Sequence, residues 1–264
     1  MARNPRRSGR RHPLASAALI VLGLVVTGGA YAAVSAATIA NANTGTASAQ
    51  TIEEGKNLFQ ANCATCHGMQ AEGTTAGPSL VGVGAAAVDF QVGTGRMPMQ
   101  ASGPQAEVKP VQFTDEQIEA LATYVASLGP GPDIPSDHLT NGGGDAANGA
   151  ELFRINCAMC HNVAGAGGAL TEGKYAPALT SVSGVHIYEA MVTGPQNMPV
   201  FNDMNISPED KRDIITYLLY VQDNSSPGGF ELGALGPVAE GLFAWVFGLG
   251  SLVLITIWIT AKSN

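Results

Sequence analysis

The sequence predicts an all-α protein in which two tandem domains of similar structure lie between an N-terminal and a C-terminal transmembrane helix. Three observations predict this fold class: an apolar segment near each end of the 264-residue chain, an internal repeat between them, and apolar residues at helical spacing within the repeat. No strand-like alternation of apolar and polar residues competes with the helical pattern. The predicted segments, in chain order, are a basic cytoplasmic tail (1–13), a transmembrane anchor (14–40), a first domain (51–129), a linker (130–146), a second domain (147–223), a second linker (224–240) and a transmembrane helix (241–260).

The first apolar segment, residues 14–40, contains no charged residue and directly follows a tail with five arginines. About 20 apolar residues are enough to span a bilayer as a helix, and the arginines predict a cytoplasmic N-terminus. The alternative is a cleaved secretory signal, because "ALIVLGLVV" has the length of a signal core and Ala47-Ser48-Ala49 resembles a cleavage site. That site lies far beyond the apolar core, which favours a retained anchor. Either interpretation predicts that the following region is exported.

The second apolar segment, residues 241–260, is also uncharged, with Trp245 and Trp258 near its ends and Lys262 just beyond. These features are typical of a membrane-spanning helix, and nothing follows it that could enclose it as a core helix. The region between the two segments is acidic: all 21 Asp and Glu residues lie within 53–240, against 7 Lys and Arg. Such a body disfavours nucleic acid and favours partners with basic or mixed docking faces.

The region between the apolar segments is a tandem repeat. "GKNLFQANCATCHG" (55–68) matches "GAELFRINCAMCHN" (149–162), and three shorter landmarks recur in the same order. These pairs are "GPSL" (77–80) with "APAL" (176–179), "GRMPM" (95–99) with "QNMPV" (196–200), and "IEALATYVASL" (118–128) with "RDIITYLLYVQ" (212–222). Two units are too few for a solenoid, so the repeat indicates two similar domains. The segment 129–147 between them is rich in proline and glycine and is predicted to contain no helix.

Each unit is predicted to open and close with a helix. Phe59 and Phe153 each lie four residues before the first cysteine of their unit, and Tyr124 and Tyr217 occupy matching places in the closing helices. We expect the opening and closing helices to cross with these rings packed nearby, and the glycines at 55 and 149 to permit a close approach. The predicted helix starts are Thr51 with Glu54, Thr114 with Gln117, Asn148 with Glu151, and Ser207 with Pro208.

All four cysteines of the chain lie in two Cys-x-x-Cys-His motifs. The motifs are Cys63, Cys66 and His67 in the first unit, and Cys157, Cys160 and His161 in the second. A helix through such a motif places two thiols on one face, near the edge of a flat ligand, and directs the imidazole towards the centre of that ligand. This suits haem c, which takes two thioether bonds and a proximal nitrogen on its iron. The sequence therefore predicts two covalently bound haem c groups.

Two other interpretations of the cysteines fit less well. Zinc ribbons separate their Cys-x-x-Cys pairs by about 15–20 residues, whereas here Cys63 and Cys157 stand 94 positions apart. A thioredoxin-like redox site requires a βαβ setting and needs neither His67 nor His161. Haem attachment explains all six residues.

The sixth iron ligand is predicted to be a methionine in each unit. Met97 and Met198 each precede a proline at matching positions before the closing helix, and methionine ligation is typical of electron-carrying cytochromes c. The alternative is that these methionines fill gaps in the core. Met99 and Met69 remain alternative ligands in the first unit, and Met204 in the second.

The remaining histidines and two prolines have other expected roles. The carbonyl groups of Pro78 and Pro177 are candidates to accept a hydrogen bond from the second ring nitrogen of each proximal histidine. His186, in "GVHIYEAMV", has no counterpart in the first unit and is interpreted as a surface or core residue. His138, in the linker, and His12, in the tail, are also poor ligand candidates.

These motifs resemble the class I cytochrome c family, over residues 51–128 and 147–222. With a basic tail, two apolar segments and tandem domains, the whole chain resembles the dihaem cytochrome c subunit of the actinobacterial cytochrome bc (menaquinol:cytochrome c reductase) complex. The resemblance implies a respiratory electron carrier within a translocase, with cytochrome b and Rieske iron–sulfur subunits as partners. It also implies electron delivery to the copper centre of a haem-copper oxidase, and haem domains on the extracytoplasmic side of the cell membrane.

No residue is a candidate for acid–base or nucleophilic chemistry, so no catalytic residue is predicted. Three other functions stay open from the sequence. A cytochrome subunit could serve a periplasmic dehydrogenase, and a dihaem peroxidase would need an open coordination site on one iron. A zinc-binding structural module would be colourless.

Overall fold

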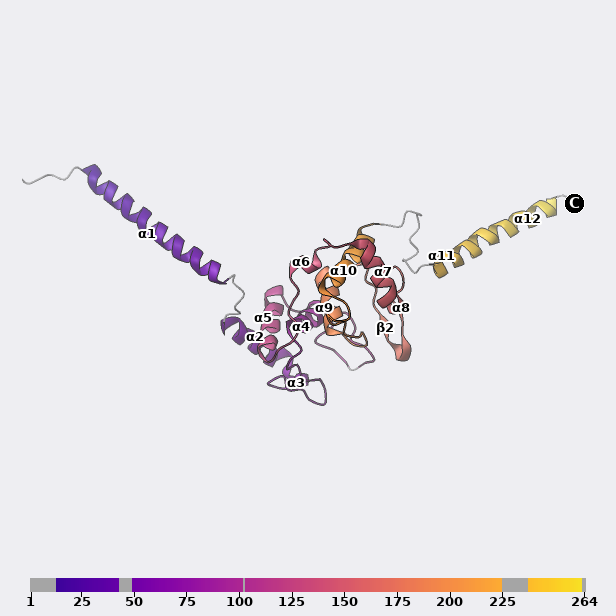
Figure 1. The fold of residues 1–264 in the computed structure, drawn as a ribbon, viewed down its shortest axis with the longest axis horizontal. Helices are drawn as coiled ribbons and strands as arrows, with labels where there is room; N and C mark the ends of the chain where they lie inside the picture. The colour runs from indigo at the N-terminus through magenta and orange to yellow at the C-terminus, as the bar shows by residue number, and fades with distance from the viewer. Residues whose placement is uncertain (1–12, 43–48, 102, 225–236, 263–264) are drawn as a thin grey trace, which may run out of the picture. The chain divides into compact units, whose positions relative to one another are not determined.

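The structure is a computed structural model that describes residues 13–42, 49–101, 103–224 and 237–262 (Figure 1). The arginine tail, Ala47 and Ser48 of the cleavage-site candidate, and most of the second linker lie outside the described residues. Residues 1–49 and 50–264 form two units.

Among the described residues of 1–49 lies the α-helix α1, which runs over Pro13–Ala42. Leu19, Leu22 and Val26 are among its exposed apolar side chains. Among its described side chains, the apolar helical stretch is Ala17–Tyr31, whose 15 residues are fewer than the roughly 20 that span a bilayer. The N-terminal membrane anchor therefore stays a prediction.

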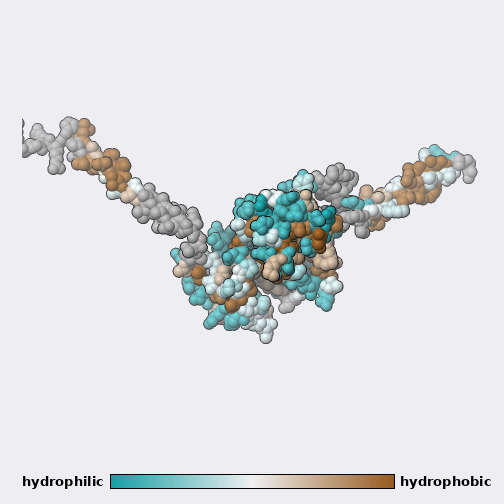
Figure 2. Space-filling model, in the orientation of Figure 1, coloured by the Kyte–Doolittle hydropathy of each residue, from teal (hydrophilic) through white to brown (hydrophobic). Residues whose placement is uncertain are grey.

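The C-terminal helical segment comprises α11 (Pro237–Phe243), a π-helical stretch (Ala244–Leu249) and α12 (Gly250–Lys262). Within the described residues, Ala239–Lys262 is the one helix that is long and apolar enough to cross a membrane. Figure 2 shows hydrophobic residues along it. Lys262 Nζ lies 5.0 Å from the centre of the Trp258 ring. The predicted apolar C-terminal helix is confirmed.

The described residues of the first repeat unit form the helices α2 (Ala49–Asn62), α3 (Ala64–His67), α4 (Ala85–Gly93) and α5 (Asp115–Ser127). Thr114 caps α5 as predicted, because its hydroxyl accepts from Gln117 N while the Gln117 side chain accepts from Thr114 N. The predicted start of α2 at Thr51 is wrong, since that helix begins two residues earlier and Thr51 lies inside its first turn.

The second repeat unit repeats this plan with additions. Asp145 caps α7 by accepting from the backbone N–H groups of Ala147 and Asn148, so the predicted cap at Asn148 is wrong. Ser207 caps α10, and Pro208 is its first residue, as predicted. The elements are α7 (Ala146–Asn156), α8 (Ala158–His161), β1 (Gly168–Ala169), a 3₁₀ turn (Thr171–Gly173), β2 (Tyr175–Ala176), α9 (Gly184–Thr193) and α10 (Pro208–Asp223), with β1 and β2 antiparallel.

The opening and closing helices of each domain cross at a glycine, as predicted. A Cβ atom added to Gly55 would overlap the carbonyl group of Ala120 in α5, and one added to Gly149 would overlap that of Asp213 in α10. The aromatic pairs pack beside these crossings, with ring centres 5.4 Å apart for Phe59 and Tyr124. The corresponding rings of Phe153 and Tyr217 are 5.6 Å apart. In each domain the cysteine motif therefore directly follows a helix whose position is fixed by packing on the closing helix.

The linker between the domains is an ordered part of the fold. The carbonyl of Pro132 accepts from Ala86 N at 3.1 Å, which ties the linker to α4. Further along, Asp137–Thr140 forms a one-turn helix, α6, that packs on α9 and α10. The prediction of no helix within 129–147 is therefore wrong at these four residues, and also at Ala146 and Ala147, which begin α7. Ser136 has the extended backbone of an N-cap, and one turn fits before the glycines at 142–144.

The two domains contact each other directly. α4 of the first packs on α9 of the second, and both lie near the centre of Figure 1. Away from the helices, Gln105 Nε2 donates to Tyr175 O and Tyr175 N donates to Gln105 Oε1, both at 2.9 Å. Ala106 N also donates to Gln196 Oε1 at 3.3 Å.

Candidate functional site

The first Cys-x-x-Cys-His motif lies at the turn from α2 into α3. Cys63 N donates to Phe59 O at 2.7 Å, and His67 N donates to Cys63 O at 3.0 Å. The motif therefore continues the helical path of α2 and brings the two thiols to the same side as the imidazole. Cys66 is exposed, Cys63 and His67 are half-buried, and both thiols are free.

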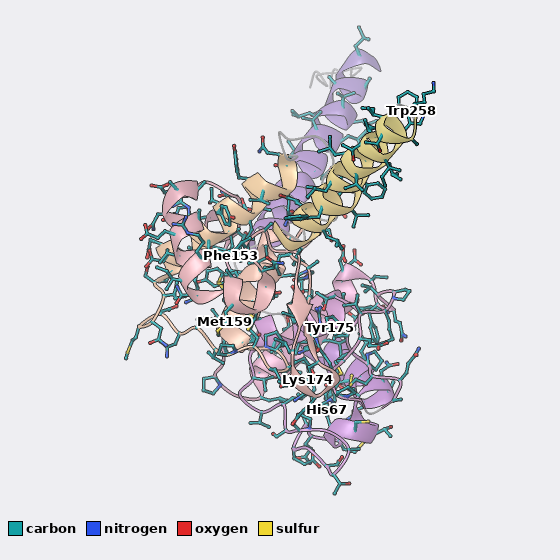
Figure 3. All side chains as sticks on the ribbon, turned by 90° about the vertical axis from the view of Figure 1, so that its right-hand side faces the viewer. His67, Phe153, Met159, Lys174, Tyr175 and Trp258 are labelled. Atoms are coloured by element: carbon teal, nitrogen blue, oxygen red, sulfur yellow. The ribbon has the colours of Figure 1, made fainter. Side chains whose placement is uncertain are left out.

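The second motif has the same geometry between α7 and α8. Cys157 N donates to Phe153 O and His161 N donates to Cys157 O, both at 2.9 Å. Cys157, Cys160 and His161 are all half-buried, and both thiols are free. In Figure 3 His67 and Phe153 mark the two domains, and Met159, inside the second motif, is 91% exposed.

Each motif histidine is oriented by a proline carbonyl. His67 Nδ1 lies 2.7 Å from Pro78 O, and His161 Nδ1 lies 3.0 Å from Pro177 O. A carbonyl oxygen can only accept, so Nδ1 carries the proton and Nε2 keeps its lone pair for a metal. Gly77 adds a second constraint in the first domain, because a Cβ there would come within 3.2 Å of the His67 ring.

The loop from motif to proline is fixed in the same way in both domains. Gly73 N donates to His67 O at 2.7 Å, and Gly167 N donates to His161 O at 2.9 Å. Both glycines have positive φ, +88° and +78°, which favours glycine. The proline carbonyl therefore reaches each histidine by the same backbone path.

Burial shifts the pKa of three motif side chains, Cys63, Cys157 and His161. Burial, followed by the neighbouring thiol of Cys66, raises the pKa of Cys63 to about 11, and burial with Cys160 does the same for Cys157. Burial lowers the pKa of His161, although its bond to Pro177 acts in the opposite direction. Both shifts favour the neutral form, a thiol at Cys157 and an uncharged imidazole at His161.

Met97 and Met198 are half-buried and pack against the apolar cores of their respective domains. The core of the first domain also contacts Cys63, and that of the second contacts Cys157. The three alternative methionines are solvent-exposed: Met99 is 40% exposed, Met69 57% and Met204 94%.

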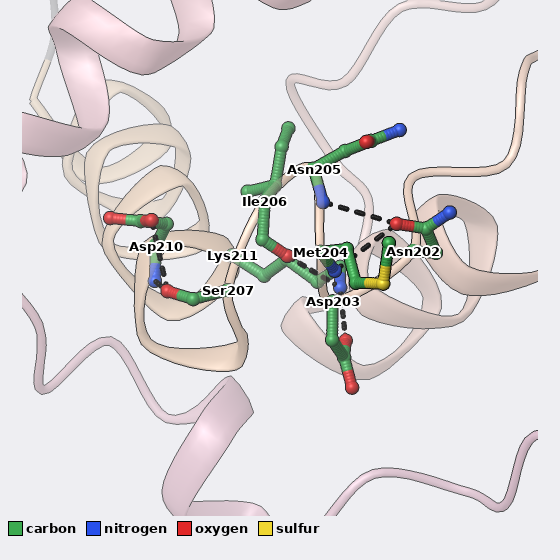
Figure 4. A network of polar contacts seen from close by, with 8 residues as sticks. All are labelled: Asn202, Asp203, Met204, Asn205, Ile206, Ser207, Asp210 and Lys211. Atoms are coloured by element: carbon green, nitrogen blue, oxygen red, sulfur yellow. Dashed lines mark hydrogen bonds and ion pairs between the residues drawn. The ribbon is translucent and has the colours of Figure 1, made fainter.

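A polar network holds the chain between Met198 and α10 (Figure 4). The buried ammonium group of Lys211 donates to Asp203 Oδ1 at 2.6 Å and to Ile206 O at 2.9 Å. Asn202 Oδ1 accepts from the backbone N–H groups of Met204 and Asn205, both at 3.1 Å. These bonds fix the loop that follows the candidate methionine ligand.

The residues present fit haem c. Each domain offers two free thiols on a helical turn and an imidazole whose Nε2 is available, together with a half-buried methionine at the core edge. This donor set matches two thioether bonds and axial His and Met ligands.

One cluster of chemically active residues lies outside these motifs and was missed in the sequence. His186 and Glu189 of α9 meet Asp89 of α4 at the contact between the domains. The spacing of His186 and Glu189 places them on one helix face, which is the only part of this arrangement that a sequence pattern could reveal.

Fold and motifs define a protein of two c-type cytochrome domains, and comparison with known families agrees. The "Cytochrome c" family model matches residues 52–129, and "Cytochrome C oxidase, cbb3-type, subunit III" matches residues 144–218. The chain is 46% identical to the "Cytochrome bc1 complex cytochrome c subunit" of Corynebacterium efficiens over 228 residues, which covers 80% of this chain and 77% of that protein. It is 42% identical to the protein of that name from Mycobacterium tuberculosis over 268 residues, which covers 99% of this chain and 95% of the relative.

The chain belongs to the family of cytochrome bc1 complex cytochrome c subunits. The resemblance predicted from the motifs is therefore confirmed. Its two cytochrome c domains bind haem c, and the chain is an electron-carrying component of a cytochrome bc complex.

Proposed function

We propose that the chain binds two haem c groups, one in each domain, and conducts electrons from the Rieske iron–sulfur centre of the bc complex to the copper centre of a haem-copper oxidase. The single observation that supports this most is the duplicated geometry of motif, proline carbonyl and half-buried methionine, within a chain whose relatives are bc1 cytochrome c subunits. In this role the chain is the cytochrome c subunit of a quinol–cytochrome c reductase, a translocase.

The residues divide the work of holding the cofactor. Cys63 and Cys66 in the first domain, and Cys157 and Cys160 in the second, form the thioether bonds. His67 and His161 are the proximal ligands. Haem c supplies a one-electron redox couple, and the protein sets its potential through axial ligands, hydrogen bonds and burial.

The proline carbonyls tune the proximal ligands. By accepting from Nδ1, Pro78 and Pro177 fix each ring and make Nε2 a stronger donor, which favours the oxidised metal. The carbonyls also prevent the imidazoles from turning away from the cofactor.

Met97 and Met198 are proposed as the sixth ligands. Packing against the core supports Met97 over Met99, whose side chain is 40% exposed. Replacement of Met97 by leucine is expected to lower the reduction potential of one haem and remove its methionine–iron charge-transfer band. Replacement of Met99 by leucine is the matched control and should change neither property. The reverse pattern would assign Met99.

The apolar segments support a proposal for the membrane arrangement. We propose that α1 is a retained anchor and that a second span follows the domains, so that both haem domains lie on the extracytoplasmic side of the cell membrane. Tethering two haem domains in one chain makes electron transfer between them intramolecular, which replaces a diffusing carrier.

The test is purification of the chain from native membranes with whatever binds it, followed by identification of the subunits and a reduced-minus-oxidised spectrum. The proposal expects cytochrome b, Rieske and oxidase subunits and two haem c per chain, both six-coordinate. Co-purification with a dehydrogenase instead would indicate that the chain is a cytochrome subunit serving that enzyme. An iron with an open coordination site would favour a peroxidase, and a colourless protein would exclude haem altogether.

A further inference from the structure

Three side chains with metal-ligating atoms meet where the first haem domain packs against the second. Asp89 lies in α4, whereas His186 and Glu189 lie one turn apart on the same face of α9. One ligating atom from each residue lies within 4.8 Å of those of the other two. The cluster is separate from both cysteine motifs and takes its members from both domains.

Glu189 is the unusual member of this cluster. Its side chain is fully buried, no donor group among the described residues satisfies its two carboxylate oxygens, and its polar neighbour is the carboxyl group of Asp89. Buried carboxyl groups in proteins are normally hydrogen-bonded or paired, because burial without a partner is costly. Burial, then the negative charge of Asp89, and then a hydrogen bond to Asp89 raise the pKa of Glu189 to about 9. A metal ion bound between the two carboxyl groups would take the place of the proton in that hydrogen bond.

A ring nitrogen of His186 lies near the carboxyl groups of Asp89 and Glu189. Its Nε2 atom lies 3.8 Å from Asp89 Oδ2, which is too long for a hydrogen bond. Two ligands of one tetrahedral zinc ion, each bound at about 2.0–2.2 Å, are roughly 3.4 Å apart, so a small side-chain movement would suffice. The ring packs edge-on against Phe90, with ring centres 6.1 Å apart, and Gly93 leaves space for it: a Cβ there would lie 3.2 Å from Nε2.

We propose that Asp89, His186 and Glu189 form a binding site for a divalent transition-metal ion such as Zn²⁺, which bridges the two haem domains. One imidazole nitrogen and two carboxylate oxygens are a donor set that zinc accepts, with water in the fourth position. The side chains of Asp89 and His186 remain 22% and 25% exposed, which leaves a route for the ion and room for that water.

One positive group lies near the site. Arg96 is buried with its guanidinium 4.8 Å from the centre of the Phe90 ring, and its charge acts on His186. Two carboxylates outweigh one guanidinium, so Arg96 weakens cation binding without preventing it. A bound ion would add a strong bridge between α4 and α9 to the hydrogen bonds that join Gln105 and Tyr175.

The test uses the full chain, purified in detergent with its haem groups attached and stripped of loosely bound metal by a chelator. Equilibrium dialysis against Zn²⁺, with the bound metal measured by elemental mass spectrometry, compares wild type with Glu189→Gln and His186→Gln. We expect the wild type to bind one more Zn²⁺ per chain than either variant, or to bind it at least about tenfold more tightly. His138→Gln, which removes an exposed histidine from α6, is the matched control and should bind as the wild type does.

Haem absorption and far-UV circular dichroism identify a variant that has failed to fold. If the buried substitution Glu189→Gln fails to fold, Asp89→Asn, at a part-exposed position, replaces it and should show the same loss. The proposal is overturned if the wild type retains no more Zn²⁺ than the folded variants, or if His138→Gln removes as much metal as His186→Gln.

Discussion

Substitution of Gly55 by alanine tests whether the helix crossing determines the stability of the first domain. The added Cβ would overlap the carbonyl oxygen of Ala120, and it would also lie 2.6 Å from the carbonyl carbon of that residue and 2.8 Å from Tyr124 Cβ. None of these atoms can move by a side-chain rotation, because two belong to the backbone of α5 and the third is attached directly to it. The helices must therefore separate or tilt.

The expected magnitude combines two opposing effects. Alanine in place of glycine inside a helix stabilises by about 0.5–1 kcal/mol. Overpacking costs about 1–3 kcal/mol, and contact with rigid backbone belongs at the top of that range or above it. The net loss should be about 2 kcal/mol, which lowers the melting temperature of a domain of this size by about 8 °C or more.

The assay is scanning calorimetry of the detergent-solubilised protein, with far-UV circular dichroism recorded in parallel. Gly103→Ala is the matched control, because the nearest atom to a Cβ added there is 3.7 Å away and the backbone needs no positive φ. That variant should melt at the wild-type temperature or slightly above it. Equal melting temperatures for the two variants would refute the inferred role of the glycine crossing.

Three further substitutions test other parts of the fold, each by the same melting experiment. Phe153→Ala empties a position that is fully buried and should destabilise the second domain by about 3–5 kcal/mol; a loss below 1 kcal/mol would mean that the ring is not in the core. Thr114→Ala removes the capping box of α5 and should cost about 1 kcal/mol, whereas no change would show that the cap does not form. Asp203→Ala leaves the buried ammonium of Lys211 without its acidic partner and should cost up to about 3 kcal/mol. Asp223→Ala, at an exposed position of α10, is the control and should change stability by less than about 0.5 kcal/mol.

The features that sequence reasoning found are those with strong local or repeated signals. The crossing glycines at 55 and 149 and the aromatic residues around them were predictable because the same residues recur in both repeat units, so each unit supports the interpretation of the other. Thr114 and Ser207 were recognisable as caps because each precedes a clear apolar helical period.

The features that could not be predicted from the sequence depend on tertiary packing. Thr51 and Asn148 resemble helix caps, but both helices begin earlier in the chain than these residues predict. In the second case, Asp145 is the residue that caps α7. Helix α6 is a single turn stabilised by packing on α9 and α10, so its residues show no period of their own. The meeting of Asp89 with His186 arises from docking of one domain on the other, which no pattern within either unit encodes.

The most direct test of the account is the intact mass of the fully denatured chain after extraction with acidified organic solvent. Covalent attachment predicts that the polypeptide keeps its colour and has the mass of the chain plus two haem groups. A variant with alanine at Cys63 and Cys66 should keep one haem group, and one with alanine at all four cysteines should keep none. A colourless wild-type polypeptide with the mass of the bare chain would contradict the account.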